Sequence, residues 1–122
     1  MRFVVLHHFV TDEFVQKSGR GTHFDLMLEF GDSLRTWAIE HWPLPQQIPQ
    51  RANRLQDHRL AYLEYQGPLS GARGHVVREA MGTYEILEKT DDWLVVRLNE
   101  MSNASRLKIE FETITAWSDE SF

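Results

Sequence analysis

Hydrophobic and polar residues alternate along much of this chain with a period of two, which is typical of β-strands. The clearest case spans residues 23–29, where Phe24, Leu26 and Leu28 would share one buried face and mostly polar residues would occupy the other. Similar short runs, rich in β-branched and aromatic residues, occupy residues 3–8, 23–30, 34–40, 62–65, 75–78, 83–88, 93–98 and 107–111. The pattern predicts a chain made mostly of short strands.

Turn-forming residues separate these runs. Gly31-Asp32 lies between two alternating runs and indicates a β-hairpin, and Gly67-Pro68 and Asp91-Asp92 indicate further turns. Many short strands joined by such turns predict a mainly β fold, a small antiparallel β-barrel with long loops and little helix.

Two stretches depart from the alternating pattern. Residues 11–22 are polar and glycine-containing, which indicates a mobile loop between the first two strands. Residues 42–54 contain three prolines, which favour an extended connection with a short turn of helix at residues 50–54. Long loops on a compact barrel are places where binding groups are often found.

Composition and charge narrow the classes of function. With 122 residues, 42% of them hydrophobic, the chain is expected to form one domain over residues 1–122 with a real core. The lack of cysteine excludes thiolate metal sites and fits a cytoplasmic protein. The first apolar run is too short for a secretion signal or membrane span, so we expect no membrane association, and we expect a monomer.

A formal net charge of −5 argues against broad binding to a nucleic-acid backbone. A local basic pocket remains compatible with the sequence, because Arg51, Arg54 and Arg59 cluster around His58. Arg51 and Arg54 could clamp a phosphate in a bidentate manner, although arginines in a proline-rich loop are more often simply solvated.

The candidate chemistry centres on imidazole and carboxylate groups. Asp25 shares a strand face with His23, and further histidines lie at His7-His8 and at His58. Two histidines and one carboxylate suit manganese, iron, zinc or a similar ion. The period of the first strand does not choose between His7 and His8. Each histidine also has an ordinary interpretation as an exposed or core residue.

Two further residues could act on a bound phosphate. His23 could contact a phosphate or act as a general acid, or it could be a polar residue on a solvated strand. Tyr62 lies four residues after His58 and could donate its phenol to an oxyanion, or it could be an aromatic core residue.

Five segments carry a more specific resemblance through their order along the chain. They are Phe3-Val4-Val5-Leu6-His7-His8, His23-Phe24-Asp25-Leu26-Met27-Leu28-Glu29, Leu34-Arg35-Thr36-Trp37-Ala38, Asp57-His58-Arg59-Leu60-Ala61-Tyr62 and Glu64-Tyr65-Gln66-Gly67. Together they resemble the 3′-phosphoesterase domain of bacterial DNA ligase D, over about the first ninety residues. The chain looks like a short, stand-alone relative without polymerase or ligase domains.

The resemblance implies a compact β-barrel with manganese-dependent activity in DNA end repair, with Zn²⁺ or another transition metal as alternatives. Such a domain removes a 3′-terminal ribonucleoside and then the remaining 3′ phosphate at primer-template ends. A separate ligase or polymerase would be a natural partner. The same sequence also allows two other functions: a phosphoesterase acting on a smaller phosphoester, and a non-catalytic metal-binding module.

The resemblance also assigns roles to individual residues. It implies that His8, Asp25 and His58 hold the metal, which selects His8 over His7. It implies that His23 is a catalytic neighbour of the metal and that Tyr62 contacts the phosphate. Arg51 matches a phosphate-contacting arginine in a loosely aligned loop.

The chain departs from the family pattern where phosphate is bound. Met27 occupies the strand position at which the family has an arginine that contacts the scissile phosphate, and a thioether cannot replace a guanidinium. The family has a lysine after the third segment, and this chain has none at the corresponding position near His41. The connection from His8 to His23 is also longer than in the family. The metal-binding residues are therefore kept, while the phosphate-binding residues are reduced.

Overall fold

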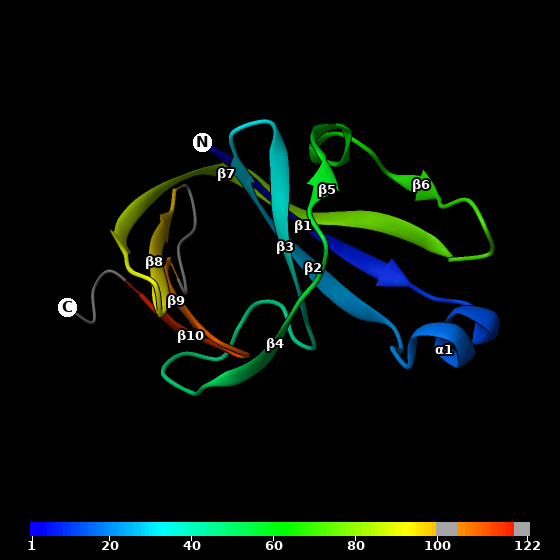
Figure 1. Ribbon diagram of the computed structural model, residues 1–122, viewed down its shortest axis with the longest axis horizontal. Helices are drawn as coiled ribbons and strands as arrows, with labels where there is room; N and C mark the ends of the chain where they lie inside the picture. Colours follow the sequence, from blue (N-terminus) through cyan, green and yellow to red (C-terminus); the bar gives the residue numbers. More distant parts are fainter. Residues whose placement is uncertain (100–104, 119–122) are drawn as a thin grey trace.

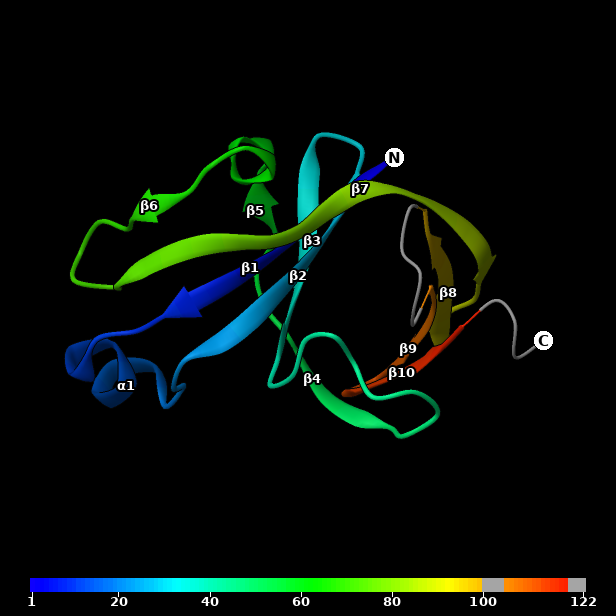
Figure 2. The ribbon, with the colours of Figure 1, turned by 180° about the vertical axis from the view of Figure 1, so that it is seen from behind.

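The computed structural model describes residues 1–99 and 105–118, which form mainly antiparallel strands (Figures 1 and 2). In chain order the elements are β1 (Arg2–Phe9), α1 (Asp12–Ser18), β2 (His23–Phe30), β3 (Ser33–Ile39), β4 (Gln50–Arg54), β5 (His58–Arg59), the 3-10 helix η1 (Leu60–Leu63), β6 (Gly67–Pro68), β7 (His75–Lys89), β8 (Trp93–Leu98), β9 (Arg106–Glu110) and β10 (Thr113–Trp117). Within the described ranges, neither helix has the length and apolar character needed to cross a membrane.

Eight strands of the described chain close into an antiparallel barrel, which confirms the fold predicted from the sequence. Their order is β1-β2-β3-β4-β10-β9-β8-β7, and β7 pairs back with β1 to close the ring. The long strand β7 makes this closure, because its first part pairs with β1 and its last part with β8. The pairing shifts register near Glu79 and again near Leu87, and such bulges help a strand to bend, as β7 does in Figures 1 and 2.

The barrel interior is filled by the apolar residues that the alternating pattern placed on one face. The buried cluster includes Phe3 and Val5 of β1, Leu26 and Leu28 of β2, and Leu107 of β9. Each of these side chains is at most 1% exposed. Burial of this set supplies most of the hydrophobic stabilisation of the fold, at about 25 cal/mol for each Å² of apolar surface removed from water.

A second, smaller apolar cluster lies on the outer face of the sheet. It contains Val4 and Leu6 of β1, Met27 of β2 and Val76 of β7, and Leu63 of η1 packs over it. Both faces of β1 and β2 are therefore buried along most of their length. The sequence predicted one buried face for residues 23–29, and the outer face is closed because the chain after β4 folds back over it (Figure 1).

The structure corrects several element predictions. Residues 62–65 were predicted as a strand, but residues 62–63 end η1 and residues 64–65 follow it as a turn, and Leu63 of η1 covers the outer cluster. Residues 75–78 and 83–88 were predicted as two strands and form the single strand β7. Residues 50–54 form strand β4 and not a helical turn, and β10 was not predicted. The hairpin at Gly31-Asp32 is confirmed, since Phe30 pairs with Ser33.

Residues 11–22 were predicted as a mobile loop but contain helix α1. The Thr11 side chain caps this helix by accepting a hydrogen bond of 3.1 Å from the backbone N–H of Phe14. Gly19 ends it in the left-handed conformation at φ 75°, which glycine adopts without strain. The helix buries no residue completely, which explains the lack of an apolar stripe in the sequence.

Candidate metal centre

Three polar side chains meet on the outer face of β1 and β2 because of the register of these strands. His8 lies directly opposite His23, and Leu6 lies opposite Asp25. Since residues two apart on a strand share a face, Asp25 points to the same side as His23 and diagonally toward His8. The antiparallel pairing therefore brings residues from two separate segments of the sequence into one cluster.

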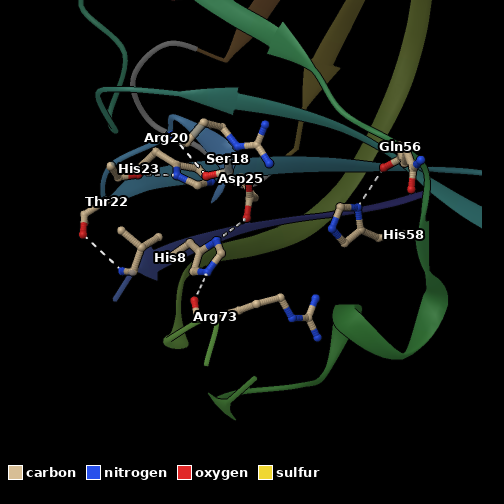
Figure 3. A network of polar contacts seen from close by, with 11 residues as sticks. His8, Ser18, Arg20, Thr22, His23, Asp25, Gln56, His58 and Arg73 are labelled. Atoms are coloured by element: carbon tan, nitrogen blue, oxygen red, sulfur yellow. Dashed lines mark hydrogen bonds and ion pairs between the residues drawn. The ribbon is translucent and has the colours of Figure 1, made fainter. Parts of the chain in front are cut away.

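Asp25 lies between the two imidazole rings (Figure 3). Its Oδ1 is 3.0 Å from Nε2 of His23, and its Oδ2 is 3.6 Å from Nδ1 of His8. The three residues are between 4% and 6% exposed, and each offers a ligand atom within 4.8 Å of the others. Buried polar groups of this kind require a compensating charge or hydrogen bond.

Backbone carbonyls fix the proton on the far nitrogen of each ring. Nε2 of His8 donates to the carbonyl oxygen of Arg73 at 2.8 Å, and Nδ1 of His23 donates to that of Gly21 at 2.7 Å. A carbonyl oxygen can only accept, so both nitrogens must carry hydrogen. In the neutral rings, the lone pairs of His8 Nδ1 and His23 Nε2 then face Asp25, and the cluster requires a cation. This is the orientation that backbone partners impose on metal-binding histidines.

The cation can be a proton or a metal ion. The pKa values of Asp25 and His23 show how the cluster favours a proton when no metal is bound. Burial by itself would raise the pKa of Asp25, but hydrogen bonds from His23 and His8, with their charges, hold that pKa below its ordinary value. Burial would likewise lower the pKa of His23, but the hydrogen bond and charge of Asp25 raise it above its ordinary value. The donor set of two imidazoles and one carboxylate fits a divalent transition metal.

The cluster forms one wall of a cavity of about 500 Å³. Other residues that line this cavity are Arg20, Met27, Arg54, His58, Tyr62 and Arg73. The cavity therefore brings together six of the seven site residues predicted from the sequence, all except Arg51, and His8 and Asp25 are in direct contact. Among the lining residues, Arg20 and Arg73 were not assigned any role from the sequence.

His58, the third metal ligand predicted from the sequence, faces the cluster from the other side of the cavity (Figure 3). Its Nδ1 donates to the carbonyl oxygen of Gln56 at 2.9 Å, which leaves the lone pair on Nε2. Its ring packs edge-on against Tyr62, with ring centroids 5.4 Å apart. The group of ligand atoms within 4.8 Å of one another contains His23 in place of His58, so the third ligand stays a prediction.

The predicted phosphate-binding arginines occupy different positions. Arg54 borders the cavity, but its guanidinium already donates to the carbonyl oxygen of Leu55 at 2.9 Å and to Asp57 Oδ1 at 2.8 Å. Arg51 is exposed and borders a separate, smaller cavity on the far side of His23. The geometry gives Arg51 no direct access to the cavity that holds the cluster.

Arg20 and Arg73 extend into the space between Asp25 and His58 (Figure 3). Nε of Arg20 is buried and has no hydrogen-bond partner in the described part of the chain. Arg73 is held by Ser70, whose carbonyl oxygen accepts from Nε at 2.7 Å. Both arginines lie in loops beside glycines, and this sequence feature is too weak to predict that their side chains line the cavity. Met27 is 1% exposed and presents an apolar surface to the same cavity.

Comparison with known proteins identifies the class. The family model of the DNA ligase D 3′-phosphoesterase domain matches residues 16–115 of this chain. A search of the curated proteins gives no match. The chain therefore belongs to the DNA ligase D 3′-phosphoesterase domain family. The matched range begins after β1, so the placement of His8 in the site rests on the strand register and on its contact with Asp25.

Proposed function

We propose that this protein is a metal-dependent phosphoesterase that acts on 3′-terminal phosphate or ribonucleotide ends of DNA. The observation that carries the proposal is the buried cluster of His8, His23 and Asp25, which requires a cation and opens onto a cavity lined by arginines. Family membership supports a phosphoesterase. Mn²⁺, a role in end repair, and cooperation with a separate ligase or polymerase are parts of the same proposal.

Two sets of residues could hold the metal. In the set proposed from the sequence, His8, Asp25 and His58 bind the ion and His23 remains free to act on the substrate. In the other set, His8, His23 and Asp25 bind it and His58 remains free. When bound, such an ion polarises a phosphate oxygen and lowers the pKa of a water molecule.

The protein residues around the cluster position the phosphate and move protons. The guanidinium groups of Arg20 and Arg73 would bind its oxygens, because both lie in the cavity and the Nε of Arg20 has an unused donor. The phenol of Tyr62 would donate to a third oxygen. The histidine that does not bind metal would first take up a proton at Nε2 and then, as an imidazolium, give that proton to the leaving oxygen, while a backbone carbonyl keeps the other proton on its Nδ1.

A direct assay tests the proposed activity. Purified protein with Mn²⁺ is incubated with a DNA oligonucleotide that ends in a 3′-phosphate and with one that ends in a 3′-ribonucleotide. We expect release of phosphate from the first and shortening of the second. Asp25→Asn should abolish both reactions, whereas the exposed turn variant Asp32→Asn should not. Metal binding without any change in either oligonucleotide would refute the proposal.

His23→Gln and His58→Gln distinguish the two ligand sets. Loss of a metal ligand weakens Mn²⁺ binding, measured as free Mn²⁺ by electron paramagnetic resonance, whereas loss of the proton donor lowers kcat with little change in metal affinity. The set predicted from the sequence requires weaker binding in His58→Gln and a kcat defect in His23→Gln. The reverse result would assign His23 to the metal. His75→Gln, which changes an exposed histidine of β7, is the matched control.

A smaller phosphoester is a second candidate substrate, which the apolar surface of Met27 and the net charge of −5 favour. A duplex-binding enzyme should lose affinity steeply as salt rises, because its phosphate contacts release counterions. A shallow salt dependence together with turnover of a small phosphate monoester would support this alternative. Normal metal binding with no turnover of any phosphoester would support a non-catalytic module.

A further inference from the structure

A second cavity adjoins the one that holds the cluster of His8, His23 and Asp25. It has a volume of about 290 Å³ and shares Tyr62, Leu69 and Arg73 with the first cavity. Its remaining wall is formed by residues of the segment from β5 to the loop before β7, Tyr65 and Arg59 among them. Arg73 therefore lies at the junction of two spaces, one lined by the candidate metal ligands and one lined by aromatic and arginine side chains.

The aromatic wall of this second cavity is held in place. The Tyr65 hydroxyl donates to the carbonyl oxygen of Pro68, so the ring is fixed at both ends. The Tyr62 and Tyr65 rings pack edge-to-face, with centroids 6.0 Å apart and planes at 84°. Tyr65 is nevertheless 37% exposed, which leaves part of a fixed aromatic ring open to a ligand. A fixed ring loses little entropy when it binds a planar partner.

The chemistry of this cavity selects a nucleobase among the parts of the proposed substrate. Exposed aromatic rings bind bases by stacking, and arginine beside them adds cation–π attraction and contacts to phosphate. A simple sugar phosphate or inorganic phosphate would leave the tyrosine wall unused. Because Arg73 borders both cavities, a phosphate beside it in the first cavity would place an attached nucleoside toward the second.

We propose that the cavity lined by Tyr62, Tyr65, Arg59 and Arg73 is a subsite for the base of the 3′-terminal nucleotide. This inference rests on the proposed phosphoesterase function and defines its substrate as a terminal nucleotide unit, as opposed to a simple phosphoester. Recognition of one terminal base also suits a chain with a net charge of −5, since it needs no extended basic surface along the DNA.

The test compares two single-stranded oligonucleotides that carry a 3′-phosphate and differ at the last residue, which is either adenosine or an abasic tetrahydrofuran. Kd is measured by fluorescence anisotropy with EDTA and again with Mn²⁺. Stacking of one base should tighten binding of the adenosine oligonucleotide by about 5- to 100-fold. Tyr65→Leu should remove most of this preference and Tyr65→Phe should keep it. Phe111→Leu, at an aromatic residue that is 80% exposed and outside both cavities, should also keep it.

Ala61→Leu provides a second variant that does not alter a tyrosine. Ala61 is exposed and lines the second cavity but not the first, so a larger side chain there should reduce the base preference by filling the subsite. Equal Kd for the two oligonucleotides in the wild-type protein, absence of binding included, would overturn the subsite. A base preference without any hydrolysis would refute the proposed activity and keep the subsite, whereas hydrolysis without a base preference would do the opposite.

Discussion

Asp25→Asn separates the charge of the central carboxylate from its shape. The amide has nearly the same size as the carboxylate, so the packing of the 4%-exposed side chain is preserved. It cannot supply the negative charge that faces the ring nitrogens of His8 and His23 at 3.6 and 3.0 Å. We therefore expect the variant to fold and to lose the affinity of the cluster for a divalent metal.

The cost in the metal-free protein follows from the hydrogen bonds. An asparagine amide can donate to the lone pair of one ring nitrogen, but its carbonyl oxygen would face the lone pair of the other. One buried pair of acceptors is thus left unsatisfied, at a cost of about 1–3 kcal/mol. At roughly 4 °C for each kcal/mol in a domain of this size, the melting temperature should fall by roughly 4–12 °C.

The effect of metal on the wild-type protein should be of similar size and in the opposite direction. A ligand present at about 100 times its Kd stabilises the folded state by about 2.7 kcal/mol, which corresponds to roughly 11 °C. A variant that binds about 100-fold more weakly gains RT ln 2 at the same concentration, about 0.4 kcal/mol or roughly 2 °C. Calorimetric scans with EDTA and with Mn²⁺ measure both quantities on the same samples.

Asp32→Asn is the control for this experiment, because it removes an exposed carboxylate from the turn between β2 and β3. It should retain the full shift caused by Mn²⁺. If Asp25→Asn shows the same Mn²⁺ shift as the wild-type protein, the metal binds elsewhere and the reasoning is refuted. A metal shift that is absent from all three proteins would refute it as well.

Three further changes test other parts of the structure. Met27→Arg should increase kcat/KM on 3′-phosphate DNA, because it returns a guanidinium to the cavity, and it should lower the melting temperature, because the position is apolar and 1% exposed. Met27→Lys is the control, and an unchanged rate in folded Met27→Arg protein would contradict the prediction. In the metal-free protein, the pKa of Asp25 is lowered by folding, so Asp25 stabilises the folded state at pH values above its ordinary pKa of 3.8, and this stability is lost as the pH falls through the pKa of the folded state. The pKa of His23 is raised by folding, so His23 stabilises the folded state at pH values below its ordinary pKa of 6.5, and this stability is lost as the pH rises through the pKa of the folded state. The melting temperature in EDTA should therefore be highest between pH 3.8 and pH 6.5. A melting temperature that keeps rising above neutral pH would contradict this prediction. Gly74→Ala should cost several kcal/mol in a denaturant titration, because a Cβ at φ 94° would lie 1.9 Å from the carbonyl oxygen of Phe9, and an unchanged midpoint would show that the strand contact is wrong.

The strands of the barrel were predictable where every second residue is buried in the barrel interior, because this burial produces alternating hydrophobic and polar residues in the sequence. β8 was predicted with its exact bounds because its alternate residues are buried in the barrel, and β2 was predicted for the same reason. Helix α1 was missed because its stability comes from the Thr11 and Gly19 caps and a surface ion pair, Glu13 to Lys17 at 2.9 Å. None of these contacts produces a helical pattern of apolar residues.

The candidate site was predictable to the extent that it depends on strand faces. The shared face of His23 and Asp25 follows from their spacing, but the pairing of His8 with His23 depends on a register that only the assembled sheet defines. The family resemblance placed His23 beside the metal, and the register of the sheet places His23 next to His8, with Asp25 in contact with both. Two arginines of the cavity were beyond prediction, because the positions of Arg20 and Arg73 are set by loops whose paths depend on long-range packing.

The division between strands and loops would allow the proposed metal-binding half of the site to be kept while the proposed phosphate-binding half changes. The ring orientations of His8 and His23 are fixed by backbone carbonyls and by the barrel itself, so a change there disturbs the fold. The guanidinium groups come from loops that can vary at low cost in stability. A strand arginine at position 27 would have to be buried against the outer cluster, whereas Arg20 and Arg73 reach the same cavity from its rim. In this protein the proposed phosphate contacts are thus best sought in the loops, and the apolar strand position strengthens the core that orients the candidate metal ligands.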